Sequence, residues 1–116
     1  MKAALNGVPQ LSTVDGWWAE GYDGTNGWAV TAPQTGDEDA AAANNVYELL
    51  EREVVPRFYD RTHRDAVPAK WLATMKHSIR QAGRLFTAAR MVQQYTSEYY
   101  APAIIGGDFP DDPPTA

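Results

Sequence analysis

Few side chains in this sequence belong to the types that perform covalent or metal chemistry. The chain has no cysteine, which excludes disulfides, thiolate nucleophiles and cysteine-bound zinc. Its two histidines, His63 and His77, lie among charged and polar neighbours. That setting is typical of surface histidines rather than of metal ligands or catalysts. The amine side chains are those of Lys2, Lys70 and Lys76.

Pairs of carboxylates raise the hypothesis of glycoside hydrolysis, which needs two acidic side chains on either side of the scissile bond. Glu51 and Glu53 form one such pair, but they fall on the predicted solvated face of a helix. Asp111 and Asp112 form another, in a predicted disordered tail. Neither setting favours catalysis. A cluster of arginines at 57, 61 and 64 is typical of a solvated or ion-paired edge, with an anion site as the alternative.

Large aromatic side chains gather in a glycine-rich stretch over 15–28. Stacked aromatics and nearby carboxylates are a way to bind sugar rings, whereas buried aromatics more often fill the core of a small domain. We expect packing and retain sugar stacking as the alternative. The aromatic residues are Trp17, Trp18, Tyr22 and Trp28, and the nearby acids are Asp15, Glu20 and Asp23.

Composition limits the classes of protein to which the chain can belong. Its 116 residues suffice for one small domain, and 44% hydrophobic with 22% charged residues is ordinary globular usage. A net charge of −5 argues against a nucleic-acid partner, which calls for a basic face. No apolar run approaches the roughly 20 residues that span a bilayer, and the first residues do not resemble a signal peptide. We expect a cytoplasmic protein.

The first third of the sequence predicts an α/β arrangement. A short helix over 1–7 would end at Asn6-Gly7, both of which tolerate positive φ. Alternation of polar and apolar residues predicts a strand over 10–14, and a second strand is expected over 28–30. Between them, Asp15-Gly16 should turn the chain into an ordered loop. Two short strands do not make an independent sheet, so the rest of the sheet is expected in sequence that is absent here.

The remainder of the sequence predicts helices. One is expected over 37–55, where apolar residues recur with helical spacing, and Pro56 should kink or break it. A second should begin near Pro68, with Gly83 interrupting it near its end. Its apolar stripe of Trp71, Leu72, Met75 and Ile79 is expected to be core, or a surface covered by the missing domain, rather than a cofactor site.

Thr87 can cap a last helix, whose apolar face comprises Ala88, Met91, Val92, Tyr95 and Tyr99. Pro102 should stop this helix. The tail beyond Gly106 is rich in proline, glycine and aspartate, and we expect it to be disordered.

The order of several short motifs resembles one protein family, the α-glucan phosphorylases that act on glycogen, starch or maltodextrin. Met1-Lys2, Asn6-Gly7 and Asp15-Gly16 match the family segment around its cofactor lysine in order and spacing. Further matches look like the shorter bacterial branch of the family, and the resemblance extends from residue 1 to about 103. These further matches are Trp17-Trp18, Asn26-Gly27-Trp28 and the segments 54–60, 71–78, 90–92 and 95–100.

This resemblance implies that Lys2 forms a Schiff base with pyridoxal phosphate, because a primary amine condenses with the cofactor aldehyde. In the family, the cofactor phosphate lies against a glycine-rich turn at a helix N-terminus and assists the substrate phosphate. The implied reaction takes α-1,4-glucan and orthophosphate to a shortened glucan and glucose 1-phosphate. The family's glycine-rich turn, sugar pocket and N-terminal domain lie upstream of the part that matches.

The resemblance also implies a fold and a domain division. Residues 1–34 would be a remnant of the cofactor-binding, Rossmann-like domain of a GT-B glycosyltransferase. Residues 35–103 would form the C-terminal helical region, and 104–116 a disordered tail. The chain would be a C-terminal fragment that is inactive alone and completed by the N-terminal part of the same enzyme. The alternative is a non-enzymatic product, either a truncated reading frame or a small helical or carbohydrate-binding interaction module.

Overall fold

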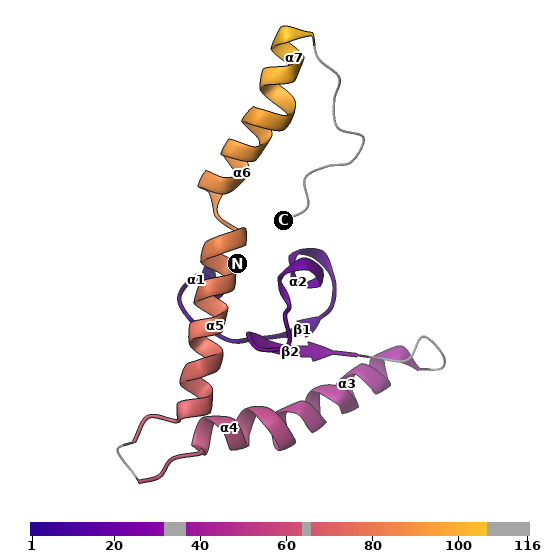
Figure 1. Cartoon of the computed structure of the whole chain (residues 1–116). Helices are drawn as coiled ribbons and strands as arrows, with labels where there is room; N and C mark the ends of the chain where they lie inside the picture. Colours follow the sequence, from indigo (N-terminus) through magenta and orange to yellow (C-terminus); the bar gives the residue numbers. More distant parts are fainter. Residues whose placement is uncertain (32–36, 64–65, 107–116) are drawn as a thin grey trace.

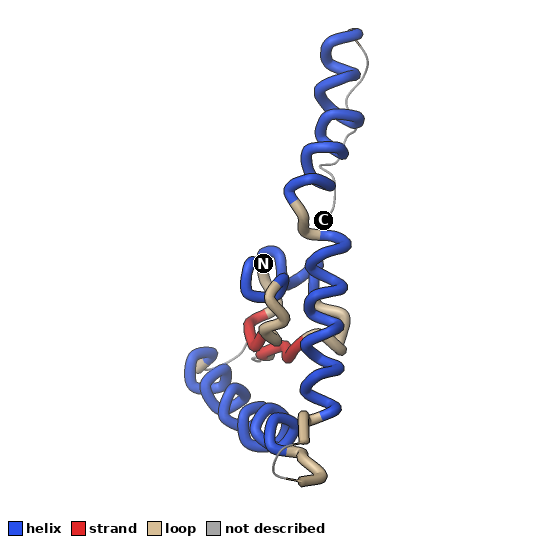
Figure 2. The backbone as a smooth tube through the Cα atoms, turned by 90° about the vertical axis from the view of Figure 1, so that its left-hand side faces the viewer, coloured by secondary structure: helices blue, strands red, loops and turns tan. Residues whose placement is uncertain are grey.

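The structure, a computed structural model, describes residues 1–31, 37–63 and 66–106. Within these residues the chain is mostly helical with two short strands, as the sequence predicts. Figure 1 shows a small α/β unit beside a long central helix, α5, and Figure 2 shows the two short strands among the helices. The α/β unit comprises α1 (Lys2–Leu5), β1 (Gln10–Thr13), α2 (Gly16–Gly21) and β2 (Gly27–Val30).

The helical part follows the second strand. In Figure 1 a long helical segment lies below the sheet, and a second helical segment lies beyond the upper end of α5. The elements, in order, are α3 (Glu38–Leu49), η1 (Leu50–Val54), α4 (Val55–Tyr59), α5 (Ala69–Leu85), α6 (Ala88–Tyr95), η2 (Thr96–Tyr100) and α7 (Ala101–Ile105). In the part of the chain that the structure describes, no helix has the length and hydropathy needed to cross a membrane.

The two strands pair in parallel, with Gln10 opposite Gly27 and Thr13 opposite Val30. Both predicted strands are confirmed to within one residue. Parallel strands need a crossover connection, and here the crossover is α2. The prediction of a loop in this region was wrong. Packing of Trp17 and Trp18 overrides the low helix propensity of the flanking glycines, and Trp18 is only 2% exposed.

The core lies where the α/β unit meets α5. Trp18, Trp28 and Val30 are buried on one side, and α5 contributes the small residues Thr74, Ser78 and Ala82. The predicted apolar stripe of α5 was therefore displaced from the true buried face. Trp71, Leu72 and Met75 are half-buried, and Ile79 is 45% exposed.

Close approach of α1 to α5 explains this displacement. The hydroxyl of Ser78 donates to the carbonyl oxygens of Ala4 and Val8, at 3.4 and 3.2 Å. Only small side chains leave room for such contact between a helix and a neighbouring backbone. Gly83 does not interrupt α5, which continues to Leu85, because one glycine in a helix costs only about 1 kcal/mol relative to alanine.

Pro56 and Pro102 are each accommodated in a helix by a stretch of π-helix that precedes them. Each is the second residue of a short α-helix that follows five residues of π-helix. Proline lacks an N–H and clashes with the carbonyl four residues earlier. The π-helical turn bypasses that carbonyl, since Val55 N bonds to the oxygen of Leu50 and Ala101 N to that of Thr96. The prediction that Pro102 stops the last helix was wrong, because the helix continues to Ile105.

The last rod, from α6 to α7, extends beyond the end of α5 (Figure 1). Thr87 caps it as predicted, with its side chain accepting a hydrogen bond from Arg90 N. Its apolar residues are poorly covered, and Val92 and Ile104 are 55% and 84% exposed. The disordered tail predicted over 104–116 begins too early, because Ile104 and Ile105 belong to α7. From 107 onward this tail lies outside the described residues.

Candidate functional site

Lys2 is the first residue of α1, and its side chain is exposed. The short helix is held in place through the opposite side. Ala4 is 2% exposed, and Gly7 adopts a φ of +78° against Ile79, where an added Cβ would come within 3.1 Å of Cδ1. These contacts fix the backbone of α1 against α5 and direct the lysine away from the core.

The side chain of Lys2 lines a groove of about 600 Å³ between α1, α2 and the start of α6. This volume falls in the range of small-ligand sites, roughly 300–1,000 Å³. Trp17 and Phe86 form an aromatic wall, with ring centroids 5.4 Å apart. The groove thus combines a primary amine with surfaces suited to a flat ring. It is lined by Met1, Lys2, Leu5, Trp17, Glu20, Phe86, Thr87, Ala88, Arg90, Met91, Gln94 and Tyr95.

Arg90 supplies a second cation to this groove. Its Nη1 donates to Gln94 Oε1, and Gln94 Nε2 donates to Glu98 Oε2 at 3.3 Å. The Nε atom of Arg90 is buried and has no hydrogen-bond partner among the described residues. A buried N–H without an acceptor is costly. In the sequence, Arg90 belongs to the segment 90–92 that resembles the phosphorylase family, and no motif spacing marks it as a site residue.

These residues fit part of a pyridoxal phosphate site. Lys2 offers the amine that the aldehyde needs, and the aromatic wall suits the ring. No glycine lines the groove in the described part of the chain, so the backbone N–H cradle expected for the phosphate is not formed by these residues. Among the described residues, the groove thus offers an amine and an aromatic wall, but no backbone cradle for a phosphate.

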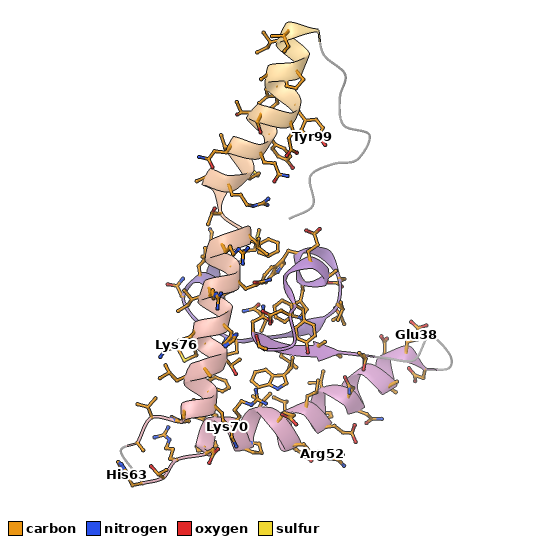
Figure 3. The ribbon with its side chains drawn as sticks, viewed as in Figure 1. Glu38, Arg52, His63, Lys70, Lys76 and Tyr99 are labelled. Atoms are coloured by element: carbon orange, nitrogen blue, oxygen red, sulfur yellow. The ribbon has the colours of Figure 1, made fainter. Side chains whose placement is uncertain are left out.

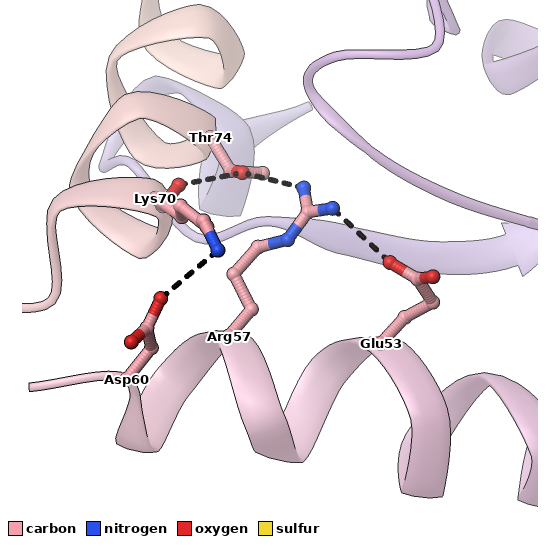
Figure 4. A network of polar contacts seen from close by, with 5 residues as sticks. All are labelled: Glu53, Arg57, Asp60, Lys70 and Thr74. Carbon is pink, nitrogen blue, oxygen red and sulfur yellow. Dashed lines mark hydrogen bonds and ion pairs between the residues drawn. The ribbon is translucent and has the colours of Figure 1, made fainter.

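The other two lysines occupy different surroundings (Figure 3). Lys70 Nζ lies 3.1 Å from Asp60 Oδ2, beside a polar network in which Arg57 contacts Glu53 at 3.1 Å and Thr74 at 3.4 Å (Figure 4). Neither Lys70 nor Lys76 lines the groove of Lys2. The expected ion-paired arginine edge is confirmed for Arg57, whereas residue 64 lies outside the described residues.

Two of the four aromatic residues in the glycine-rich stretch are buried. Trp18 and Trp28 are 2% and 6% exposed, and Trp28 contacts Trp71 with ring centroids 5.9 Å apart. Buried rings cannot stack on a sugar, so packing is confirmed for these two. Trp17 and Tyr22 are half-buried, and Trp17 lines the groove of Lys2.

Neither carboxylate pair gains support as a catalytic pair. Glu51 and Glu53 are exposed, and Glu53 forms the ion pair with Arg57. Residues 111 and 112 lie outside the described part. Both histidines are exposed, as predicted, and no cluster of metal-ligating side chains occurs among the residues that the structure describes.

The amino-acid sequence is similar to those of three known phosphorylases. The chain is 44% identical over 102 residues to a glycogen phosphorylase of Aquifex aeolicus and 41% identical over 108 residues to a maltodextrin phosphorylase of Thermococcus litoralis. It is 45% identical over 107 residues to a glycogen phosphorylase of Mycobacterium tuberculosis. This chain is homologous to a segment of the glycogen and maltodextrin phosphorylases.

The match is that of a segment. It covers 87%, 90% and 89% of this chain in the three comparisons, but only 15%, 12% and 12% of the relatives. No family profile matches the chain, and no solved structure matches it. The resemblance read from the motifs is therefore confirmed as homology over a small part of much longer enzymes.

Proposed function

We propose that this chain is a C-terminal segment of an α-glucan phosphorylase. The complete enzyme would transfer glucosyl units from α-1,4-glucan to orthophosphate and release glucose 1-phosphate. The observation that carries the proposal is the identity of 41–45% to glycogen and maltodextrin phosphorylases over most of the chain. A cytoplasmic location stays a prediction.

The incomplete sheet supports assignment of residues 1–34 to a remnant of a Rossmann-like GT-B domain. Parallel sheets occur almost only with several strands and both faces covered, yet β1 and β2 form a sheet of two strands with four residues each. Backbone groups on the outer edges of both strands would pair with further strands of the complete enzyme. Residues 35–103 would then form the closing helical region.

Lys2 is proposed as the residue that holds pyridoxal phosphate. When bound, the cofactor supplies a phosphate group that can exchange a proton with substrate phosphate. The part of this chain is to present the amine at the start of α1, with Ala4 and Gly7 anchoring the helix on α5. Trp17 and Phe86 form the aromatic wall of the groove beside that amine.

The proposed substrates and the N-terminal part of the enzyme would act on the other side of Lys2. Catalysis of phosphate transfer depends on placed donors, and among the described residues Lys2 and Arg90 are the basic side chains that line the groove. We therefore expect no formation of glucose 1-phosphate from glycogen or maltodextrin by the 116-residue chain alone. Activity above a protein-free blank would contradict this expectation.

The decisive experiment uses the longer enzyme that contains this sequence. The holoenzyme is reduced with borohydride, digested and mapped by mass spectrometry. The phosphopyridoxyl group is expected on Lys2. Its presence on Lys70 or Lys76 would disprove the assignment, because neither residue lines the groove. Phosphorolysis of maltodextrin by the same preparation tests the family activity separately.

A further inference from the structure

A second pocket shares no lining residue with the groove of Lys2. It has a volume of about 320 Å³ and lies between the loop after α2 and one face of α5. The α5 residues that line it follow the spacing i, i+3, i+4, i+7, which places them on one helix face. The lining residues are Asp23, Thr25, His77, Arg80, Gln81 and Arg84.

Hydrogen bonds in the loop determine the tautomer of His77. Oδ1 of Asp23 accepts from Thr25 N at 2.8 Å and from Thr25 Oγ1 at 2.7 Å. Burial raises the pKa of Asp23, but the hydrogen bonds from Thr25 and Asn26, together with the nearby His77, outweigh burial and lower it. The ionised carboxylate only accepts hydrogen bonds, so the single hydroxyl proton of Thr25 is directed to Asp23.

The oxygen of Thr25 also lies 2.8 Å from Nδ1 of His77. Since the hydroxyl proton is already used, Nδ1 must be the donor in this contact. In neutral imidazole a protonated Nδ1 leaves Nε2 as an acceptor. The loop end of the pocket therefore presents two acceptors, Nε2 of His77 and the carboxylate of Asp23.

The other end of the pocket is cationic. Arg80 and Arg84 have no ion pair or hydrogen bond with any described residue, and α5 contains no acidic residue. They are separated by one helical turn, where like charges repel. Planar guanidinium groups bind phosphate in a bidentate manner. His77 and Arg84 are about 10 Å apart along the helix axis, at 1.5 Å per residue.

A neighbouring pocket on the other side of His77 also contains cations, but these are already neutralised. Arg57 and Lys70 line it, and they pair with Glu53 and Asp60 at 3.1 Å each. An anion gains more from arginines that have no carboxylate partner. The pocket of Arg80 and Arg84 is thus the stronger anion site of the two.

We propose that the pocket between the 23–26 loop and α5 binds a sugar phosphate, with the phosphate on Arg80 and Arg84 and the sugar hydroxyls on His77 and Asp23. The two acceptors at the loop end disfavour a second anion and accept hydrogen bonds from hydroxyl groups. The two arginines at the other end bind the phosphate. The site is separate from the groove of Lys2 and does not depend on the proposed phosphorolysis.

The test is a titration of the 116-residue chain, labelled with ¹⁵N, with α-D-glucose 1-phosphate, orthophosphate and glucose. We expect saturable shifts of the Arg80 and Arg84 Nε–H signals, with glucose 1-phosphate binding more tightly than orthophosphate and glucose not binding. The double variant R80Q/R84Q should weaken binding of glucose 1-phosphate by about tenfold or more, the usual scale of a lost charged contact.

Lys76→Gln is the matched control. It removes one positive charge from the same helix, but Lys76 does not line the pocket, so its effect should stay within about twofold, as for a screened surface charge. His77→Phe should abolish the preference for glucose 1-phosphate over orthophosphate. Equal weakening by K76Q and R80Q/R84Q, equal binding of the two phosphates by the unaltered chain, or no saturable binding would each overturn the proposal.

Discussion

Replacing Gly27 with alanine tests the packing of the two strands. An added Cβ at this position would lie 2.3 Å from the carbonyl oxygen and 2.9 Å from the nitrogen of Gln10. Gln10 is the residue opposite Gly27 in the parallel pair. The obstacle is therefore backbone of the partner strand, which cannot rotate away as a side chain can.

The expected cost follows from this geometry. Overpacking of side chains in a core costs about 1–3 kcal/mol, and here relief requires the strands to separate. We expect Gly27→Ala to destabilise the chain by about 3 kcal/mol, at the upper end of that range. Gly83→Ala is the matched control, because its added Cβ would meet only Leu5 Cδ2 at 3.9 Å. Within α5 this change should stabilise by about 1 kcal/mol.

Urea unfolding of the chain, followed by tryptophan fluorescence and far-UV circular dichroism, measures both variants. Trp28 adjoins the altered strand position, so its fluorescence reports local separation of β1 and β2. The two variants should differ by about 4 kcal/mol in free energy of unfolding, the sum of the two opposite effects. If Gly27→Ala matched or exceeded the stability of the unaltered chain, the close strand contact described here would be refuted.

Three further predictions concern other parts of the molecule. In the longer enzyme, Lys2→Ala should eliminate borohydride-trapped phosphopyridoxyl label while leaving the circular dichroism spectrum unchanged; persistent label would contradict the role of Lys2. Ser78→Ala removes the hydroxyl that bonds to the backbone of α1 and of Val8. It should therefore lower the free energy of unfolding by about 1 kcal/mol and speed amide exchange at Leu5. Unchanged exchange would show that other contacts hold α1. The pKa of Asp23 lies below its ordinary value of 3.8, so its stabilisation of the loop is complete above the unfolded-state pKa and is lost as the pH falls through the lower folded-state pKa. A titration of the Thr25 amide shift checks this, and a midpoint at or above 3.8 would contradict it.

The sequence was sufficient for elements whose signal is local. Alternation identified β1, a short run over 28–30 indicated β2, and both strands were found to within one residue. It failed where tertiary contact decides. The helix α2 forms in a glycine-rich stretch because Trp18 is buried against its neighbours, and no local preference reports that burial.

The buried face of α5 shows the same limit of local patterns. Apolar spacing favoured Trp71, Met75 and Ile79, yet the closest contact with α1 requires the small side chains of Ser78 and Ala82. For the candidate site, Lys2 was identified from ordered motifs of a family. The groove and the position of Arg90 in it depend on the approach of α6 to α1, a contact between distant segments that single-sequence periodicity does not encode.

Each π-helical turn changes the direction, around the helix axis, of the side chains that follow it. Each residue of an α-helix advances the side-chain direction by about 100°, and a π turn inserts about one extra residue without ending the rod. Side chains after Pro102 are therefore rotated by about 100° from the positions that a regular helical wheel assigns. Val92 and Ile104 are twelve positions apart, so their side chains would differ by about 120° on a regular wheel but differ by about 20° after the extra residue. Ile104 therefore continues the line of Val92 because of the π-helical turn. A one-residue deletion within 96–100 would remove the wider turn and leave Ile104 in the same direction, at the cost of forcing Pro102 against the carbonyl that the turn now avoids.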